Sequence, residues 1–280
     1  MDHRKPLLPV KYDVVFRLFF ADERNAEDLK NLLKSILSLP EDDYNEIEIA
    51  DPHLLPDYVG DKLAVIDIKL YTKSRKVIHI EIQLQVTPAM RERIVFYDAK
   101  LITEQMGSGD RYDEIRKVIS IIITDEMFIP DSPRYHHRFT FYDPDAGVEF
   151  SDTVEIHSIE LPKLPDDTDG TPLYDWAKFI AAETEEELEM IAERNPQVGK
   201  AVVRLRALSA DERARDMIER REKGERDFQM FLDYAERRGH AKASENVVRK
   251  LLKRGRPIEE IMEDTDLTRE EIEALSKQQN

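Results

Sequence analysis

Two neighbouring segments decide the fold of this chain: LAVIDIKLY at residues 63–71 and VIHIEIQLQ at residues 77–85. In both segments an apolar residue occurs at every second position, which is the period of a β-strand. The polar connection between them, residues 72–76, is short enough for a hairpin, and Pro88 closes the second strand. The pattern therefore predicts two antiparallel strands, each with one apolar and one polar face.

The polar face of this hairpin carries the groups that are capable of chemistry. Alternate side chains of a strand share a face, so Glu81 lies with His79 and Gln83, and Asp67 lies with Lys69. Two paired strands bring Asp67 and Glu81 together, and adjacent carboxylates are costly unless a proton or a hard divalent cation such as Mg²⁺ neutralises them. The alternative interpretation is a half-exposed hairpin whose polar face is solvated.

The flanking patterns place this hairpin inside a larger α/β unit. Residues 12–39 predict two helices, the second beginning at Ala26 and ending before Pro40. Residues 90–106 predict a helix with Ile94, Val95, Leu101 and Ile102 on one side, and residues 118–124 (VISIIIT) predict a strand buried on both faces. Shorter strands are expected at residues 139–142 and 153–161. Beyond Pro172 nearly all of the pattern is helical, with capping boxes at Thr184 and Thr268.

This order of elements resembles the PD-(D/E)xK nuclease superfamily, and specifically its transposase-like branch, the recombination-promoting nuclease (Rpn) family. The matching segments are KYDVVFRLFF (11–20), VIDIK (65–69), HIEIQ (79–83), RIVFYDAKLITEQ (93–105), ISIIITD (119–125) and the tail GRPIEEIMEDTDLTREEIEAL (255–275). The resemblance implies an α/β fold with a restriction-endonuclease-like αβββαβ core and a mixed sheet, followed by an all-helical C-terminal extension. It also implies a DNA endonuclease with little sequence preference and a role in promoting recombination.

Carried over position by position, the resemblance implies that Asp67 and Glu81 bind the metal together with the backbone carbonyl of Ile82. The ion would be Mg²⁺ or another divalent cation such as Ca²⁺ or Mn²⁺. Gln83 stands where the superfamily has its lysine, and an amide can orient a water molecule but carries no positive charge. Asp67, Glu81 and Gln83 are therefore the expected catalytic residues.

Four further residues are candidates for auxiliary roles. Lys69 shares a strand face with Asp67, and Tyr97 and Lys100 form a polar stripe with Arg93 on the following helix, which is equally consistent with an exposed helix face. Asp13 opens the first helix. It is expected there either near the metal, as in related cores, or for its favourable interaction with the helix N-terminus.

Composition limits the classes of function. The 280 residues carry a net charge of −17 and contain no cysteine, which excludes disulfides and thiolate chemistry. No apolar run is long enough to span a membrane and the N-terminus lacks the pattern of a signal peptide, so we expect a cytoplasmic protein without membrane contact.

The one basic stretch, residues 197–256, has 17 basic and 10 acidic residues. Either it contacts DNA phosphates through Arg204, Arg206, Arg213 and Arg220, or it forms a helix laced with internal ion pairs.

The composition shift at residues 162–172 predicts the domain organisation. We expect a nuclease-like core at residues 1–165, a helical extension packed on it at 166–224 and a helical tail at 225–280. DNA is the expected partner, and cleavage of both strands would be consistent with a homo-oligomer. The alternative function is a non-catalytic interaction module that keeps the nuclease fold and acts through its helical tail.

Overall fold

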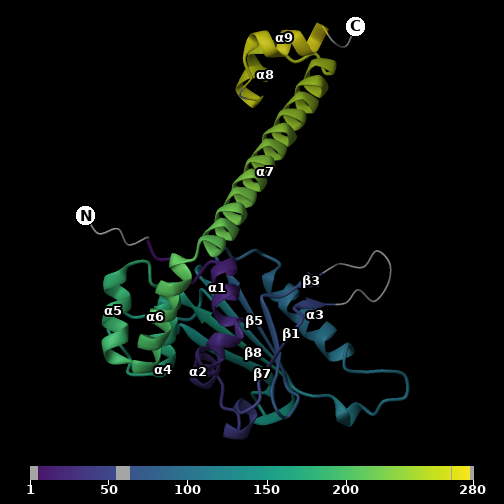
Figure 1. The fold of residues 1–280 in the computed structure, drawn as a ribbon. Coiled ribbons are helices and arrows are strands. Elements are labelled where there is room, and N and C mark those ends of the chain that lie inside the picture. The colour runs from purple at the N-terminus through teal and green to yellow at the C-terminus, as the bar shows by residue number, and fades with distance from the viewer. Residues whose placement is uncertain (1–5, 55–63, 266, 278–280) are drawn as a thin grey trace, which may run out of the picture. The chain divides into compact units, whose positions relative to one another are not determined.

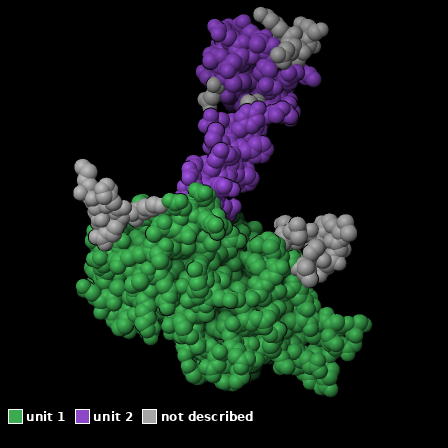
Figure 2. All heavy atoms as spheres, viewed as in Figure 1, with its two compact units in different colours: residues 1–218 green, residues 219–280 purple. Residues whose placement is uncertain are grey.

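The computed structural model describes residues 6–54, 64–265 and 267–277 (Figure 1). The chain divides into two compact units, Met1–Ile218 and Glu219–Asn280 (Figure 2). The expected boundary at residue 165 lies within the first unit, and the expected boundary at residue 224 lies within the long helix α7 (Glu212–Lys253).

A mixed six-stranded sheet organises the first unit, in the order β1-β4-β5-β6-β8-β7. Its strands are β1 (Glu48–Ala50), β4 (Ile68–Tyr71), β5 (Val77–Gln83), β6 (Val118–Thr124), β7 (His136–Asp143) and β8 (Val148–Glu160). Strands β1, β4 and β5 are antiparallel neighbours, β5, β6 and β8 run parallel, and β7 returns antiparallel to β8. A separate two-stranded sheet consists of β2 (His53–Leu54) and β3 (Ala64–Val65).

The predicted hairpin is present, but its first strand is shorter than the sequence pattern suggests. β4 and β5 pair with Ile68 opposite Ile80 and Tyr71 opposite Val77. The expected strand at residues 63–71 is interrupted, because β3 pairs with β2 and a bend at Asp67 precedes β4. Leu63 lies outside the described residues. The bend directs the Asp67 carboxylate to the backbone amide of Ile82 on β5, at a distance of 2.8 Å.

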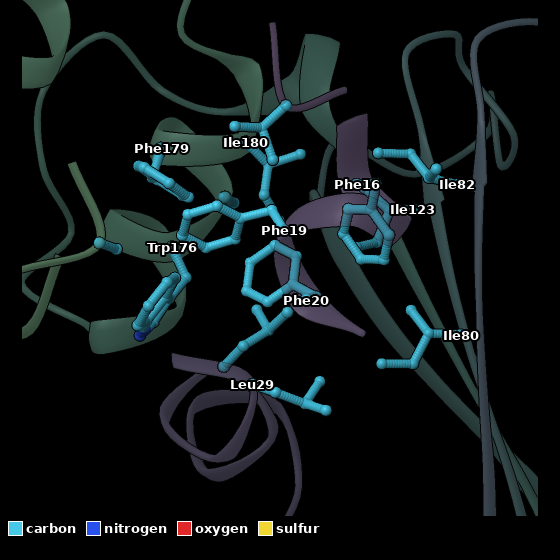
Figure 3. Close-up of a cluster of buried hydrophobic side chains, with 14 of the residues drawn as sticks. Phe16, Phe19, Phe20, Leu29, Ile80, Ile82, Ile123, Trp176, Phe179 and Ile180 are labelled. Carbon is cyan, nitrogen blue, oxygen red and sulfur yellow. The ribbon is translucent and has the colours of Figure 1, made fainter. Parts of the chain in front are cut away.

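One face of the sheet packs against the two predicted N-terminal helices, α1 (Asp13–Phe20) and α2 (Ala26–Ile36). The apolar side chains of alternate strand positions point into this core, among them Ile80, Ile82 and Ile123. Figure 3 shows these isoleucines beside Phe16 of α1, and Phe19 and Phe20 of α1 toward the aromatic side chains of the later helices.

Helix α3 (Met90–Thr103) packs over strands of the opposite face, where the polar side of the hairpin lies. His79 is fully buried and Glu81 is 5% exposed. The alternative of a solvated polar face is therefore wrong. The expected apolar side of this helix also needs correction: Val95 is 60% exposed, whereas Asp98 is buried against His79.

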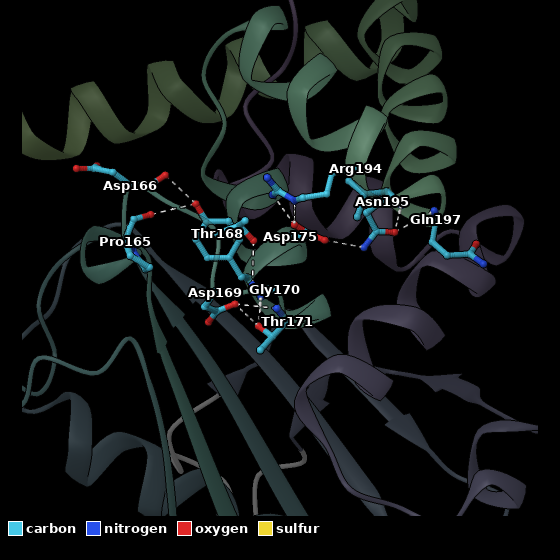
Figure 4. A network of polar contacts seen from close by, with 12 residues as sticks. Pro165, Asp166, Thr168, Asp169, Gly170, Thr171, Asp175, Arg194, Asn195 and Gln197 are labelled. Atoms are coloured by element: carbon cyan, nitrogen blue, oxygen red, sulfur yellow. Dashed lines mark hydrogen bonds and ion pairs between the residues drawn. The ribbon is translucent and has the colours of Figure 1, made fainter.

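Helices α4 (Pro172–Ala181), α5 (Glu185–Arg194) and α6 (Pro196–Ala210) belong to the same hydrophobic core as α1 and α2. Trp176 of α4 lies 6.1 Å from the Phe20 ring, centroid to centroid. Polar contacts connect these helices: Asp175 accepts hydrogen bonds from Arg194 and from the Asn195 side chain (Figure 4). The capping box predicted at Thr184 is confirmed, with both reciprocal hydrogen bonds present.

The second unit contains most of α7 with α8 (Ile258–Thr265) and α9 (Arg269–Lys277). It has a small core of its own around Val248, Ile261 and Ile272. Glu271 accepts a hydrogen bond from the Thr268 backbone amide at 2.8 Å, as the second capping box requires. Four short 3₁₀ helices complete the described structure: η1 (Glu23–Asn25), η2 (Glu41–Tyr44), η3 (Tyr112–Glu114) and η4 (Leu161–Lys163).

Candidate active site

The structure brings the three expected catalytic residues together at the carboxyl end of β5. Asp67 comes from the bend before β4, and its Oδ2 accepts a hydrogen bond from the amide of Ile82. Gln83, the last residue of β5, donates from Nε2 to Glu81 Oε2 at 3.0 Å. Each carboxylate is thus held by a donor of β5. A metal-binding role for the Ile82 carbonyl stays a prediction.

The pKa of the Glu81 carboxyl is strongly perturbed. Burial and, second, the negative charge of Asp67 raise its pKa to about 8, against the opposing effect of Arg93. Its Oε1 atom is buried and accepts no hydrogen bond from the residues that the structure describes. The pKa of Tyr97 is also raised, by burial and then by the charge of Glu81. These residues therefore share one electrostatic environment.

This arrangement fits a divalent cation. Two carboxylates lie close enough to repel, and Oε1 of Glu81 is buried without a donor among the residues that the structure describes, which is the situation that an oxygen-seeking ion relieves. Within the described residues, no set of three or more Asp, Glu, His or Cys side chains could hold a metal. Asp67 and Glu81 are two carboxylates that could hold an ion here, with water or substrate oxygens completing the coordination, and this role stays a prediction.

Comparison with known families identifies the family of this chain. A model of the PD-(D/E)XK nuclease family transposases matches residues 10–235. The chain belongs to this family. The match spans every residue of the site described above, and the mixed sheet with its helices is consistent with the family's α/β fold. Comparisons with curated proteins and with solved structures gave no significant match.

Both lysines considered as substitutes for the family's missing lysine have other contacts. Lys69 Nζ forms an ion pair with Glu104 Oε2 at 2.8 Å, just beyond the end of α3. Lys100 is buried, and its Nζ lies 5.5 Å from the centre of the Phe96 ring. In this member of the PD-(D/E)XK nuclease family, the positive charge of Arg93 lowers the pKa of Glu81, against the effects of burial and of Asp67.

Asp13 is the first residue of α1, whose N-terminal capping position is Tyr12. It is half-buried in the first turn, where both the helix-terminus and the catalytic interpretation still apply.

Asp67 also borders a cavity of about 340 Å³ that is lined by residues of α1 and β1, including Arg17 and Ile49.

The sequence interpretation missed an ion pair at this end of the sheet. Lys11 contacts Asp125 at 2.8 Å and Glu183 at 2.6 Å. The Asp125 amide in turn donates to the Gln83 carbonyl at 3.0 Å. The available signal was that Asp125 follows a buried strand, since parallel neighbouring strands end at the same edge of a sheet.

The four candidate DNA-binding arginines lie in different surroundings. Arg204 pairs with the buried Asp28 at 2.9 Å, and Arg206 pairs with Glu185 and Glu189 of α5. Both therefore pair with acids of other helices, α2 and α5, and not with acids of their own stretch, which the alternative expected. Arg213 lines a cavity of about 450 Å³, and Arg220 is exposed on α7. Contact of these residues with DNA stays a prediction.

No helix in the described parts of the chain has the length and apolar character needed to cross a bilayer.

Proposed function

We propose that this member of the PD-(D/E)XK nuclease family is a DNA endonuclease that depends on Mg²⁺ or a similar divalent cation and has little sequence preference. The observation that carries the proposal is the pairing of Asp67 with the buried Glu81, whose Oε1 has no donor among the described residues. Membership of the family supports a nuclease-like activity, and its transposase description extends the proposal to a role in recombination. We further propose a cytoplasmic location.

The chain's own residues would have distinct roles. A bound Mg²⁺ would supply a water of lowered pKa and Lewis-acid stabilisation of the phosphate. The Ile82 amide fixes the position of Asp67, and Gln83 fixes Glu81. The remaining polar atoms of the Gln83 amide can orient a water molecule for in-line attack.

The test is cleavage of supercoiled plasmid in Mg²⁺, in Mn²⁺ and in EDTA. We expect nicking that requires the metal and falls by at least ~100-fold in Asp67→Asn and Glu81→Gln. Both substitutions preserve shape, so thermal unfolding should show that the variants are folded. Glu92→Gln, which changes an exposed acid of α3, is the matched control and should cleave like the unmodified protein.

Cleavage that persists in both site variants would disprove the site assignment. Absence of cleavage by the unmodified protein with every metal would favour the alternative of an interaction module with a nuclease-like fold.

A further inference from the structure

Gln83 stands where the PD-(D/E)xK motif has a lysine, so the motif position carries no positive charge; the inference below rests on the proposed nuclease function. When the water oxygen bonds to phosphorus, the bond from phosphorus to the leaving oxygen breaks and one water proton ends on that oxygen. Negative charge develops on the phosphate oxygens during this exchange, and a fixed cation stabilises it. Gln83 is uncharged, so another residue must supply the charge.

The direction of α3 over the sheet determines which of its side chains reach Glu81. At its N-terminal end, Arg91 donates to the carbonyl of Phe128, which follows β6. Just past its C-terminal end, the Gln105 side chain donates to the carbonyl of Arg116, which precedes β6. Helix α3 therefore runs antiparallel to β6 and to its parallel neighbour β5.

A hydrogen-bonded contact sets the register of α3 on β5. His79 Nε2 lies 3.0 Å from Asp98 Oδ1, and both side chains are buried. Glu81 is two residues further along the strand, about 6.7 Å. Because α3 runs antiparallel to β5, the same distance corresponds to between four and five residues from Asp98 toward the N-terminus of α3, at about 1.5 Å per residue. This places Ile94 and Arg93 at the level of Glu81. Ile94 is buried in an apolar cluster, whereas the charge of Arg93 acts on the Glu81 carboxyl, which agrees with this level.

The same register moves the two lysines away from Glu81. Lys100 follows Asp98 in the helix, so it lies on the other side of His79 from Glu81. Lys69 is the strand partner of His79 and is paired with Glu104, also beyond Asp98. Arg93, in contrast, is half-buried, and its Nε is enclosed without a hydrogen-bond acceptor among the described residues.

We propose that the Arg93 guanidinium replaces the lysine of the PD-(D/E)xK motif and binds the non-bridging oxygens of the scissile phosphate. Its position beside Glu81 puts a permanent positive charge next to the two acids. Its planar set of N–H donors suits bidentate contact with phosphate. The positive charge thus comes from α3, whereas the motif would place it on β5.

The proposal predicts a specific pattern of variants in the plasmid assay. Arg93→Gln should lower kcat/KM by ~100-fold to ~1000-fold, and Arg93→Lys should keep part of the activity. Arg91→Gln removes the same charge from an exposed position two residues away and should leave cleavage nearly unchanged. In the Arg93→Gln background, Gln83→Lys should raise kcat/KM by at least ~10-fold, because it returns a cation to the motif position.

A binding assay separates this inference from the proposed function. We would measure the affinity for a fluorescent DNA duplex in Ca²⁺, with thermal unfolding as the folding control. Arg93→Gln should bind about 10-fold more weakly than Arg91→Gln. Equal affinity of these two variants would overturn the role of Arg93. So would a double variant, Arg93→Gln with Gln83→Lys, that cleaves no faster than Arg93→Gln alone. Failure of the unmodified protein to cleave would count against the nuclease proposal, while the difference in affinity would still test Arg93.

Discussion

Glu81 and Asp67 carry the same functional group in different surroundings. Asp67 is half-buried and accepts a backbone hydrogen bond, whereas Glu81 is 5% exposed and one of its oxygens lacks a donor among the described residues. Burial penalises the charged form, and the neighbouring negative charge of Asp67 adds to this effect. With a pKa of about 8, the Glu81 carboxyl is therefore protonated at neutral pH when no cation is bound.

This difference predicts how stability depends on pH. The folded protein keeps the Glu81 proton up to about pH 8, whereas the unfolded chain releases it near 4.5. The stabilisation that comes from the raised pKa of Glu81 is therefore fully present below about pH 4.5 and is lost as pH rises toward 8. Glu81→Gln should abolish this loss and be more stable than the unmodified protein at pH 8.5, by on the order of 2 kcal/mol. Urea denaturation across this pH range measures the effect.

Glu92→Gln serves as the control for the pH experiment, since Glu92 is exposed and should leave the pH dependence unchanged. An identical slope in Glu81→Gln and the unmodified protein would show that Glu81 is not the responsible group. Mg²⁺ should stabilise the unmodified protein increasingly as pH rises, because the metal binds the deprotonated carboxylate.

Helix α3 depends on polar contacts as well as on apolar packing. His79 and Asp98 meet across the interface between β5 and α3, and Ser120 of β6 hydrogen-bonds to both. All three side chains are buried. Since such a cluster tolerates few alternative arrangements, it fixes the helix along the strand direction and so sets which α3 residues face Glu81.

The cluster predicts a large cost for losing one member. Asp98→Ala removes the acceptor shared by His79 and Ser120 and leaves both buried without it, so we expect a loss of ~3 kcal/mol in the free energy of unfolding. Chemical denaturation measures this loss. Glu92→Ala on the same helix removes an exposed acid and should change stability little; equal losses in the two variants would contradict a structural role for the cluster.

At the scale of the whole molecule, the helices after the sheet complete the core of the first unit. Trp176 and Phe179 of α4 contact Phe20 and Phe19 of α1, and Ala214 and Ile218 belong to the same cluster. A chain that ends before these helices would expose the apolar faces of α1 and α2 to water.

We therefore expect residues 1–165 alone to fail to fold, and residues 1–222 to fold. Circular dichroism and thermal unfolding of the two fragments test this. The longer fragment should unfold cooperatively, and the shorter one should show no cooperative transition. Cooperative unfolding of residues 1–165 would instead support the independent core that the sequence composition suggested.

The sequence by itself determined the β4–β5 hairpin with the helices and the strand that flank it, and the grouping of Asp67, Glu81 and Gln83, but it did not predict β1 or β2. These features follow from local periodicity and turn residues, which depend on neighbours in the chain. Only the tertiary structure decided that α3 buries the polar face, that Lys69 and Lys100 have other contacts, and that Arg93 lies level with Glu81. These depend on how a helix docks on a sheet. Burial of Asp98 with His79 outweighed the apolar pattern that pointed Val95 inward, because the buried His79 would otherwise lose the carboxylate partner that Asp98 supplies, which costs more than exposing a valine.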